Sequence, residues 1–302
     1  MKSLHISIAL LLLLNISFIQ QSSFAQTTYN QEATDSRNNL ILLGKSTRER
    51  LQQQPFGDWF NTNYSHYTID SITANSIKPL VKGKRFVIFM GTWCGDSRRE
   101  VPGMYKLLDY CGVQPSQIEL VNVSNSDTAY KQSPTHEERG LNIHRVPDLL
   151  VYAGKKEIGR IVESPVETLE KDLLNILSGK PYEPNYKGVT FLYPQWRKSS
   201  VNDLTSRQQQ LASQLKPLVK NRYELHSYGL IHLALKETEK AILIFRLNTL
   251  LYPAEPEMWN GLAQAYLQKE DTTAALEQYR KAISLQPTNE TAAKMIQQLS
   301  KQ

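Results

Sequence analysis

The residues best suited to do chemistry lie in the segment FVIFMGTWCGDSRREVP, residues 86–102. Cys94 follows a continuous apolar run and precedes a polar stretch with a helical pattern. This order predicts a thiol at a helix N-terminus, where unpaired backbone amides and the helix dipole favour an anion. Because the thiolate is the nucleophilic form of cysteine, Cys94 is predicted to be a catalytic nucleophile in thiol-disulfide exchange.

The residues after Cys94 determine how its thiolate is stabilised and how a mixed disulfide can be released. Ser97 lies one helical turn further on and is predicted to donate a hydrogen bond to the thiolate. The residues expected to tune the thiolate are Gly95, Asp96 and Arg98, since the arginine adds positive charge and the aspartate opposes it. No second thiol stands at position 97, so release of a mixed disulfide requires a second cysteine of the client or an outside thiol.

The remaining cysteine, Cys111, is a poor candidate for that second thiol. A helix from 94 to 111 spans roughly 25 Å, whereas a disulfide needs Cα atoms within about 7 Å. We therefore expect Cys111 to be buried as a small apolar side chain. The histidines have no metal-ligand spacing with one another or with the cysteines, so no metal site and no cofactor are expected.

The elements that must position Cys94 alternate between strand and helix. The pattern predicts a strand at 85–91, a helix from 95 to about 110, a strand at 117–123, a short helix, a hairpin at 148–162 and a helix from a capping box at 164–167 to 178. This order is typical of a small α/β sandwich with a central sheet. Upstream, we expect a flexible polar stretch to about Asn39 and a helix from a capping box at 46–49 to Gln54.

Three features of this block resemble the thioredoxin superfamily, and within it the exported thioredoxin-like proteins of Bacteroidetes-type bacteria. Trp93 and Cys94 match the opening of that family's active-site motif, and Pro102 matches the proline that bends its active-site helix. Pro147 matches its cis-proline, which faces the active-site cysteine. The resemblance implies that Trp93, Val146 and Pro147 bind substrate, with the Val146 backbone pairing with a bound peptide.

The chain also departs from that family's pattern. Ser97 replaces the second, resolving cysteine of the motif. Ile88 stands where many thioredoxins have a buried aspartate that moves protons for the second thiol, and Leu120 stands near the place of its lysine partner. The resemblance therefore implies a monothiol C-x-x-S site.

The C-terminal region contains two similar segments that end at Pro253 and Pro287, 34 residues apart. This period, with small residues at helix crossings, is typical of the tetratricopeptide repeat (TPR). The second copy matches at Trp259, Leu262, Ala263, Tyr266, Ala275, Tyr279, Ala282 and Pro287, whereas the first departs at Leu225, His232 and Asn248. Helices at about 204–219 and 289–300 are expected to cap the repeats, which would dock a protein or peptide.

The start of the chain and its charge bear on location and partners. Residues 1–25 are typical of a signal peptide cleaved after Ala25, with an uncleaved anchor as the alternative. This predicts a periplasmic or secreted protein with no stable membrane insertion after cleavage. Lys and Arg number 35 against 29 Asp and Glu, but the excess is scattered, so nucleic acid is not an expected partner.

The predicted organisation is an α/β thioredoxin-like fold followed by an all-α TPR region. We predict a signal peptide at 1–25, an N-terminal extension with a helix at 26–75, a thioredoxin-like domain at 76–180, a linker and capping helix at 181–221, and TPR-like repeats with a C-terminal capping helix at 222–302. The favoured function is thiol-disulfide exchange with protein clients that carry cysteines or disulfides. The alternative is a non-catalytic adaptor that uses both regions as recognition surfaces. A hydrolase built on Ser97 is weaker, because spacing identifies no His or Asp partner.

Overall fold

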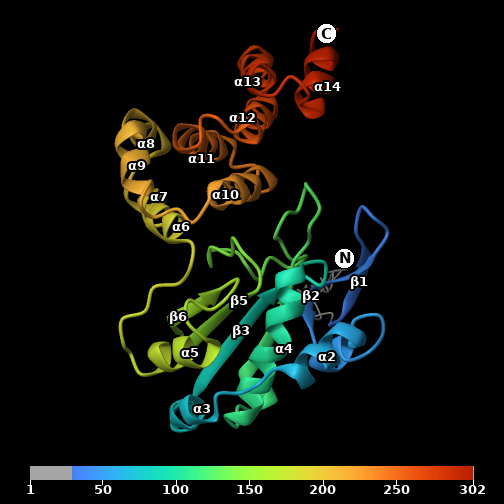
Figure 1. Cartoon of the computed structure of the whole chain (residues 1–302), viewed down its shortest axis with the longest axis vertical. Helices are drawn as coiled ribbons and strands as arrows, with labels where there is room; N and C mark the ends of the chain where they lie inside the picture. The colour runs from blue at the N-terminus through green and yellow to red at the C-terminus, as the bar shows by residue number, and fades with distance from the viewer. Residues whose placement is uncertain (1–28, 302) are drawn as a thin grey trace, which may run out of the picture.

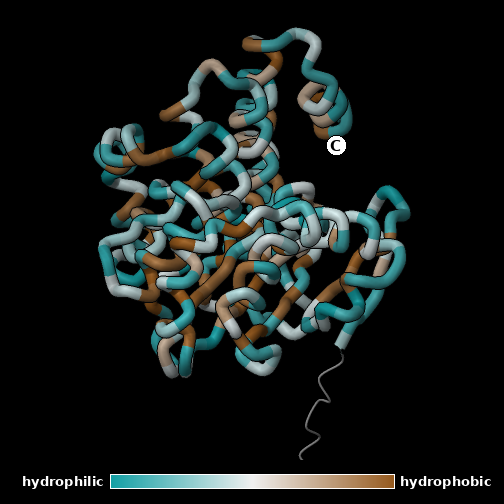
Figure 2. The backbone as a smooth tube through the Cα atoms, turned by 60° about the horizontal axis from the view of Figure 1, so that its bottom comes forward, coloured by the Kyte–Doolittle hydropathy of each residue, from teal (hydrophilic) through white to brown (hydrophobic). Residues whose placement is uncertain are grey.

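The computed structural model describes residues 29–301, and the predicted signal peptide lies outside them. The chain forms a sheet part, residues 29–180, which contains a six-stranded mixed sheet with flanking helices. It is followed by a helical part, residues 187–299, which contains only helices and turns (Figure 1). Figure 2 shows apolar backbone segments, in brown, gathered inside the molecule and hydrophilic segments, in teal, on the outer turns.

The sheet has the strand order β1-β2-β4-β3-β5-β6. Its strands are β1 (Gln31–Thr34), β2 (Leu40–Ser46), β3 (Lys84–Met90), β4 (Ile118–Asn122), β5 (Asp148–Ala153) and β6 (Lys156–Val162). The central strand β3 pairs in parallel with β4 and antiparallel with β5. Its last five residues are buried, as expected for a strand covered on both faces. The predicted strands at 85–91 and 117–123 and the predicted hairpin are thus confirmed.

Helix α4 (Gly95–Tyr110) positions the site and contributes much of the core. It lies against the sheet and beside α2 (Gly57–His66), and its Met104, Leu107 and Leu108 are buried with Phe60 and Phe86 in one apolar cluster. The other helices of the sheet part are α1 (Arg48–Leu51), α3 (Ser71–Ile77) and α5 (Leu169–Leu177), with 3₁₀ turns η1 (Lys78–Leu80) and η2 (Pro115–Gln117). Cys94 therefore sits at one end of a helix that is fixed along its length by packing.

The N-terminal segment differs from the prediction. The stretch expected to be flexible contains β1, which forms an antiparallel hairpin with β2, and β2 joins the sheet by pairing with β4. Burial of Ile41 and Leu42 explains why this segment is ordered. Ser46 belongs to β2 and does not cap a helix; the side chain of Thr47 caps α1 instead, accepting from the Arg50 amide at 3.3 Å.

Between β4 and α5, one predicted helix is absent and the start of another is misplaced. No helix occurs between β4 and β5, where the backbone turns repeatedly and Lys131, His136 and Asn142 have positive φ. Helix α5 begins at Leu169 with Thr168 as its cap, rather than in the segment 164–167. The buried Asp172 carboxylate accepts the backbone amides of that segment at 2.6 and 3.2 Å, which keeps it out of the helix.

The helical part is confirmed as helical throughout after residue 202. Its helices are α6 (Lys187–Leu192), α7 (Gln195–Lys198), α8 (Val201–Ser206), α9 (Gln208–Leu215), α10 (Arg222–Ala234), α11 (Thr238–Leu251), α12 (Pro256–Gln268), α13 (Thr272–Leu285) and α14 (Glu290–Leu299). The first two lie in the segment predicted as linker. None of the helices of residues 29–301 is long and apolar enough to cross a membrane.

The repeat helices pack through small residues against one large ring. Phe245 is fully buried, and a Cβ on Gly229 or Gly261 would come within 2.6 or 2.7 Å of its ring. Glycine at these two positions therefore allows α10 and α12 to approach α11. In the second copy Ala263, Tyr266, Ala275 and Tyr279 are buried, Trp259 is half-buried and Pro287 lies exposed just after α13.

Candidate functional site

Cys94 is the residue immediately before α4, and its backbone is extended. Its carbonyl accepts the Arg98 amide at 3.0 Å, which starts the helix, and its half-buried side chain makes no capping bond. The turn from β3 is held by Trp93, whose indole donates to the Val123 carbonyl at 2.8 Å. Gly91 is required for this turn, because a Cβ there would come within 2.4 Å of the Trp93 ring.

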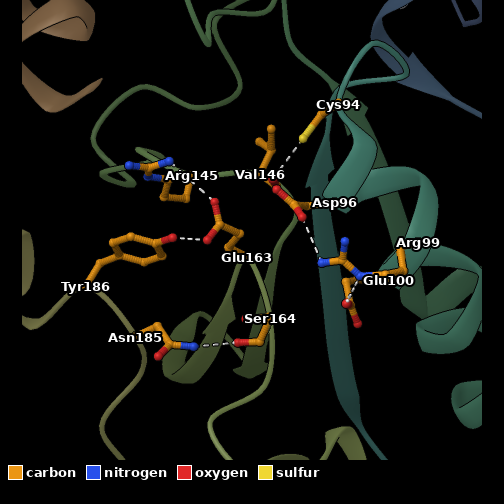
Figure 3. A network of polar contacts seen from close by, with 10 residues as sticks. All are labelled: Cys94, Asp96, Arg99, Glu100, Arg145, Val146, Glu163, Ser164, Asn185 and Tyr186. Atoms are coloured by element: carbon orange, nitrogen blue, oxygen red, sulfur yellow. Dashed lines mark hydrogen bonds and ion pairs between the residues drawn. The ribbon is translucent and has the colours of Figure 1, made fainter. Parts of the chain in front are cut away.

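The thiol faces the loop that leads into β5. Cys94 Sγ lies 3.4 Å from the carbonyl oxygen of Val146 (Figure 3). The Val146–Pro147 bond is cis. The structure thus brings together Cys94, Val146 and Pro147. A thiol can donate to this carbonyl, whereas a thiolate has no proton to give. Ionisation of Cys94 therefore breaks this contact and leaves the carbonyl free for another donor, such as a peptide amide.

Ser97 is close to Cys94 in sequence but has a different partner. It is fully buried, and its hydroxyl oxygen accepts the Gly91 amide at 3.3 Å. Among the hydrogen bonds of residues 29–301, none joins Ser97 to Cys94. The contact that the sequence predicted is absent from this thiol form of the site, and the serine instead ties the first turn of α4 to the end of β3.

The charged residues of the first turn are partly used elsewhere. Arg98 Nε donates to the Thr92 carbonyl at 2.6 Å, so this cation folds back over the turn before the helix. Asp96 pairs at 2.7 Å with Arg99, which also pairs with Glu100 at 2.8 Å. Gly95 is exposed, and a Cβ added there would meet nothing within 4 Å. The surface beside the thiol is therefore open at Gly95.

A polar network on the other side of Val146 was missed by sequence reasoning. Arg145 Nη1 lies 3.4 Å from Glu163, and the Tyr186 hydroxyl donates to the same carboxylate (Figure 3). Burial raises the pKa of Glu163, while Arg145 opposes the shift. Arg145 Nη2 also donates to the Tyr223 carbonyl of α10 at 2.8 Å. The residue next to Val146 thus links the loop at the thiol to the helical part.

A buried carboxylate next to Pro147 was missed as well. Asp148 begins β5, has no exposed surface and lies 3.1 Å from Arg160. Burial raises its pKa to about 7, and the arginine opposes that shift. The sequence contains a signal for this buried carboxylate, because a single acidic residue directly precedes the apolar run of β5. Ile88 and Leu120, where the sequence predicts that no proton-transferring pair is present, are buried neighbours in the parallel β3–β4 pair.

The second cysteine lies at the opposite end of α4. Cys111 is buried, its Sγ lies 3.6 Å from the Ala74 carbonyl, and both cysteines are free. Burial raises the pKa of the Cys111 thiol to about 11, which keeps it protonated. The prediction of a buried, packing cysteine is confirmed. Among residues 29–301 no group of three His, Cys, Asp or Glu side chains could hold a metal ion.

The repeat region has a hollow on the face formed by α10, α12 and α14. It measures about 580 Å³ and is lined by polar and aromatic side chains, among them Tyr223, His226, Asn260, Gln264 and Tyr279. Tyr223, whose carbonyl accepts from Arg145, is exposed and is one of the residues that line this hollow. The hollow and the contact between the helical part and the loop that carries Val146 therefore share this residue.

A family model for the tetratricopeptide repeat matches residues 256–289. The match covers α12 and α13, the copy in which the residue spacing fits best, so the chain contains a C-terminal TPR region. A TPR region indicates protein–protein interaction and thus a protein partner. No curated protein matches the chain.

Proposed function

We propose that the chain is an exported, thioredoxin-like protein that exchanges disulfides with protein clients through Cys94, with the TPR region docking a partner. The observation that carries the proposal is the position of the thiol. It lies immediately before the 16-residue helix α4, 3.4 Å from the carbonyl that precedes cis Pro147, at an open surface. Helix N-termini favour thiolates, and a free backbone carbonyl accepts an extended peptide.

Rearranging a client disulfide through Cys94 needs no reactant other than the client protein. The Cys94 thiolate attacks one sulfur of a client disulfide, forming the mixed disulfide and releasing the other client sulfur as a thiolate. Cys111 cannot release the adduct, because it is buried at the far end of α4. A client thiolate attacks the client sulfur of the adduct instead, and Cys94 leaves as a thiolate. The client's disulfide is rearranged with no net oxidation. If an outside thiolate attacks the Cys94 sulfur of the adduct instead, the client leaves as a dithiol, and a second outside thiol then frees Cys94, so that two outside thiols are oxidised to one disulfide.

The test is covalent trapping in the native envelope. Cells expressing the tagged full chain are quenched with N-ethylmaleimide, and captured protein is run on non-reducing gels. The proposal predicts reductant-sensitive adducts for the wild type and for Cys111→Ser, and none for Cys94→Ser.

The alternative is an adaptor without catalysis, supported by the TPR match and the hollow beside it. It predicts that Cys94→Ala captures the same partners as the wild type, while Trp259→Ala or Tyr266→Ala loses them. Adducts that depend on Cys94 would exclude the adaptor as the whole function. Partner capture without any adduct in the wild type would exclude the exchange chemistry.

A further inference from the structure

A second pocket lies where the two parts of the chain meet. It has a volume of about 490 Å³ and is lined by the loop before β5 on one side and by α7, α10 and the start of α11 on the other. Cys94 does not line it. Tyr193, at the edge of the pocket, donates its hydroxyl to the Gly140 carbonyl at 2.7 Å, which joins the two walls. Pockets of this size between domains are typical of small-molecule sites.

Two polar groups that line this pocket have no partner in residues 29–301. His232 Nε2 and Gln132 Nε2 belong to side chains that are 6% and 8% exposed and come from opposite walls. The other ring nitrogen of His232 lies 2.5 Å from Glu237, so a neutral ring that donates there presents Nε2 as an acceptor. Gln132 offers amide protons. Buried polar groups normally find partners, so these two point to a ligand with both acceptor and donor atoms.

The charges around the pocket favour an anion. Lys131, Arg139 and Arg197 line it, and none of them has a carboxylate partner among the residues that the structure describes. Lys131 is only 4% exposed, with the Tyr130 hydroxyl as its acceptor at 2.8 Å. The two acidic residues of the lining are already occupied, since Glu138 accepts from Ser133 and Glu237 is paired with His232 and Lys240. The Lys131 ammonium also lies over the Tyr130 ring, 4.3 Å from the ring centroid, so both of these partners are neutral and a bound anion would supply the missing counter-charge.

The rest of the lining is apolar and aromatic. Trp196 donates its indole proton to the Tyr228 hydroxyl at 3.3 Å, and the His232 ring lies edge-on to both of these rings. Ile231 and the exposed Leu235 extend this wall. We propose that this pocket binds a small organic anion with an aromatic body, its charged group held by Arg139, Arg197 and Lys131 and its ring against Trp196. This site is separate from the Cys94 chemistry.

The test uses a probe of that chemistry, 8-anilinonaphthalene-1-sulfonate, titrated into the full chain and followed by its fluorescence. We expect saturable binding at one site. The uncharged analogue N-phenyl-1-naphthylamine, which has the same rings without the sulfonate, should bind at least about tenfold more weakly, a loss of about 1.4 kcal/mol. The variant Arg139→Glu/Arg197→Glu should lose at least about tenfold in affinity for the sulfonate probe.

Two controls make the outcome decisive. Arg37→Glu changes an exposed arginine in the turn between β1 and β2 and should leave affinity unchanged, as should Cys94→Ser, which removes the proposed exchange activity. Circular dichroism checks that each variant is folded. Equal binding of the two probes, or equal affinity in the pocket and Arg37 variants, would overturn the proposal. Since Cys94→Ser tests only the exchange reaction, failure of either proposal is distinguishable from failure of the other.

Discussion

The second repeat and the Cys94 site differ in how far apart along the chain their contacting residues lie. The repeat is one segment, residues 256–289, in which a helix, a turn and a second helix pack on each other. The site joins Cys94 to Val146, 52 residues away, through two different connections of a sheet. A local unit leaves a regular spacing in the sequence, whereas a site assembled across a sheet leaves only separate residues.

The two parts also have separate apolar cores, so a substitution in one core is expected to lower the stability of that part without lowering the stability of the other. One apolar cluster contains Phe86, Met104 and Cys111, and another contains Phe245, Ala263 and Tyr279. They are joined at the junction by a few polar and aromatic contacts, such as that of Arg145 with Tyr223 and that of His144 with Tyr228. The prediction with the largest expected effect tests whether the two parts unfold independently.

Phe245→Ala should lower the free energy of unfolding of the helical part by about 3–5 kcal/mol, because it removes a fully buried ring. The loss of far-UV helical signal in urea measures this. In a Cys94→Ser background, labelling of the buried Cys111 thiol reports the sheet part, and its midpoint should stay unchanged. Ile72→Ala, at a side chain that is 83% exposed, is the matched control for the truncation. A parallel shift of both midpoints would mean that the two parts unfold as one.

Asp148→Asn should change how the stability of the sheet part depends on pH. The folded state raises the pKa of this carboxyl from 3.8 to about 7, so its contribution is fully present below pH 3.8 and is lost as pH rises towards 7. The wild type should therefore lose about 3 kcal/mol relative to the variant between pH 4 and 7. Urea unfolding monitored at Cys111 checks this; a constant difference between the two proteins would show that Asp148 is ionised throughout.

Glu237→Gln should have the smallest effect, and it lies in the helical part. The hydrogen bond from His232 lowers the pKa of Glu237 from 4.5 to about 2, so its stabilisation is present above pH 4.5 and is lost as pH falls towards 2. Its side chain is 38% exposed, so we expect a loss of about 0.5 kcal/mol at pH 7. The helical signal in urea at pH 7 and pH 3 measures it, with Glu239→Gln as the control at a more exposed carboxylate. A loss that is equal at both pH values would contradict the assigned cause.

Parts of the fold were predictable because local chemistry decides them. The apolar run before Cys94 is typical of a buried strand and the polar pattern after it is typical of a helix, so β3 and α4 were placed within a residue. Helix starts were less predictable, since Ser46 and Ser164 have the right residue type for a cap. Ser46 is drawn into β2 by pairing with Leu120, and the segment at Ser164 is held out of α5 by Asp172.

The sequence by itself determined the helix that begins after Cys94, the burial of Cys111 and the second repeat, because each follows from residue types within one short continuous segment. Only the tertiary structure decided that the thiol faces the Val146 carbonyl, that Ser97 bonds Gly91 instead of Cys94, and that Arg145 links the site to the helical part. These contacts join residues from elements whose relative positions are set by packing of the whole sheet, and no local pattern encodes such positions.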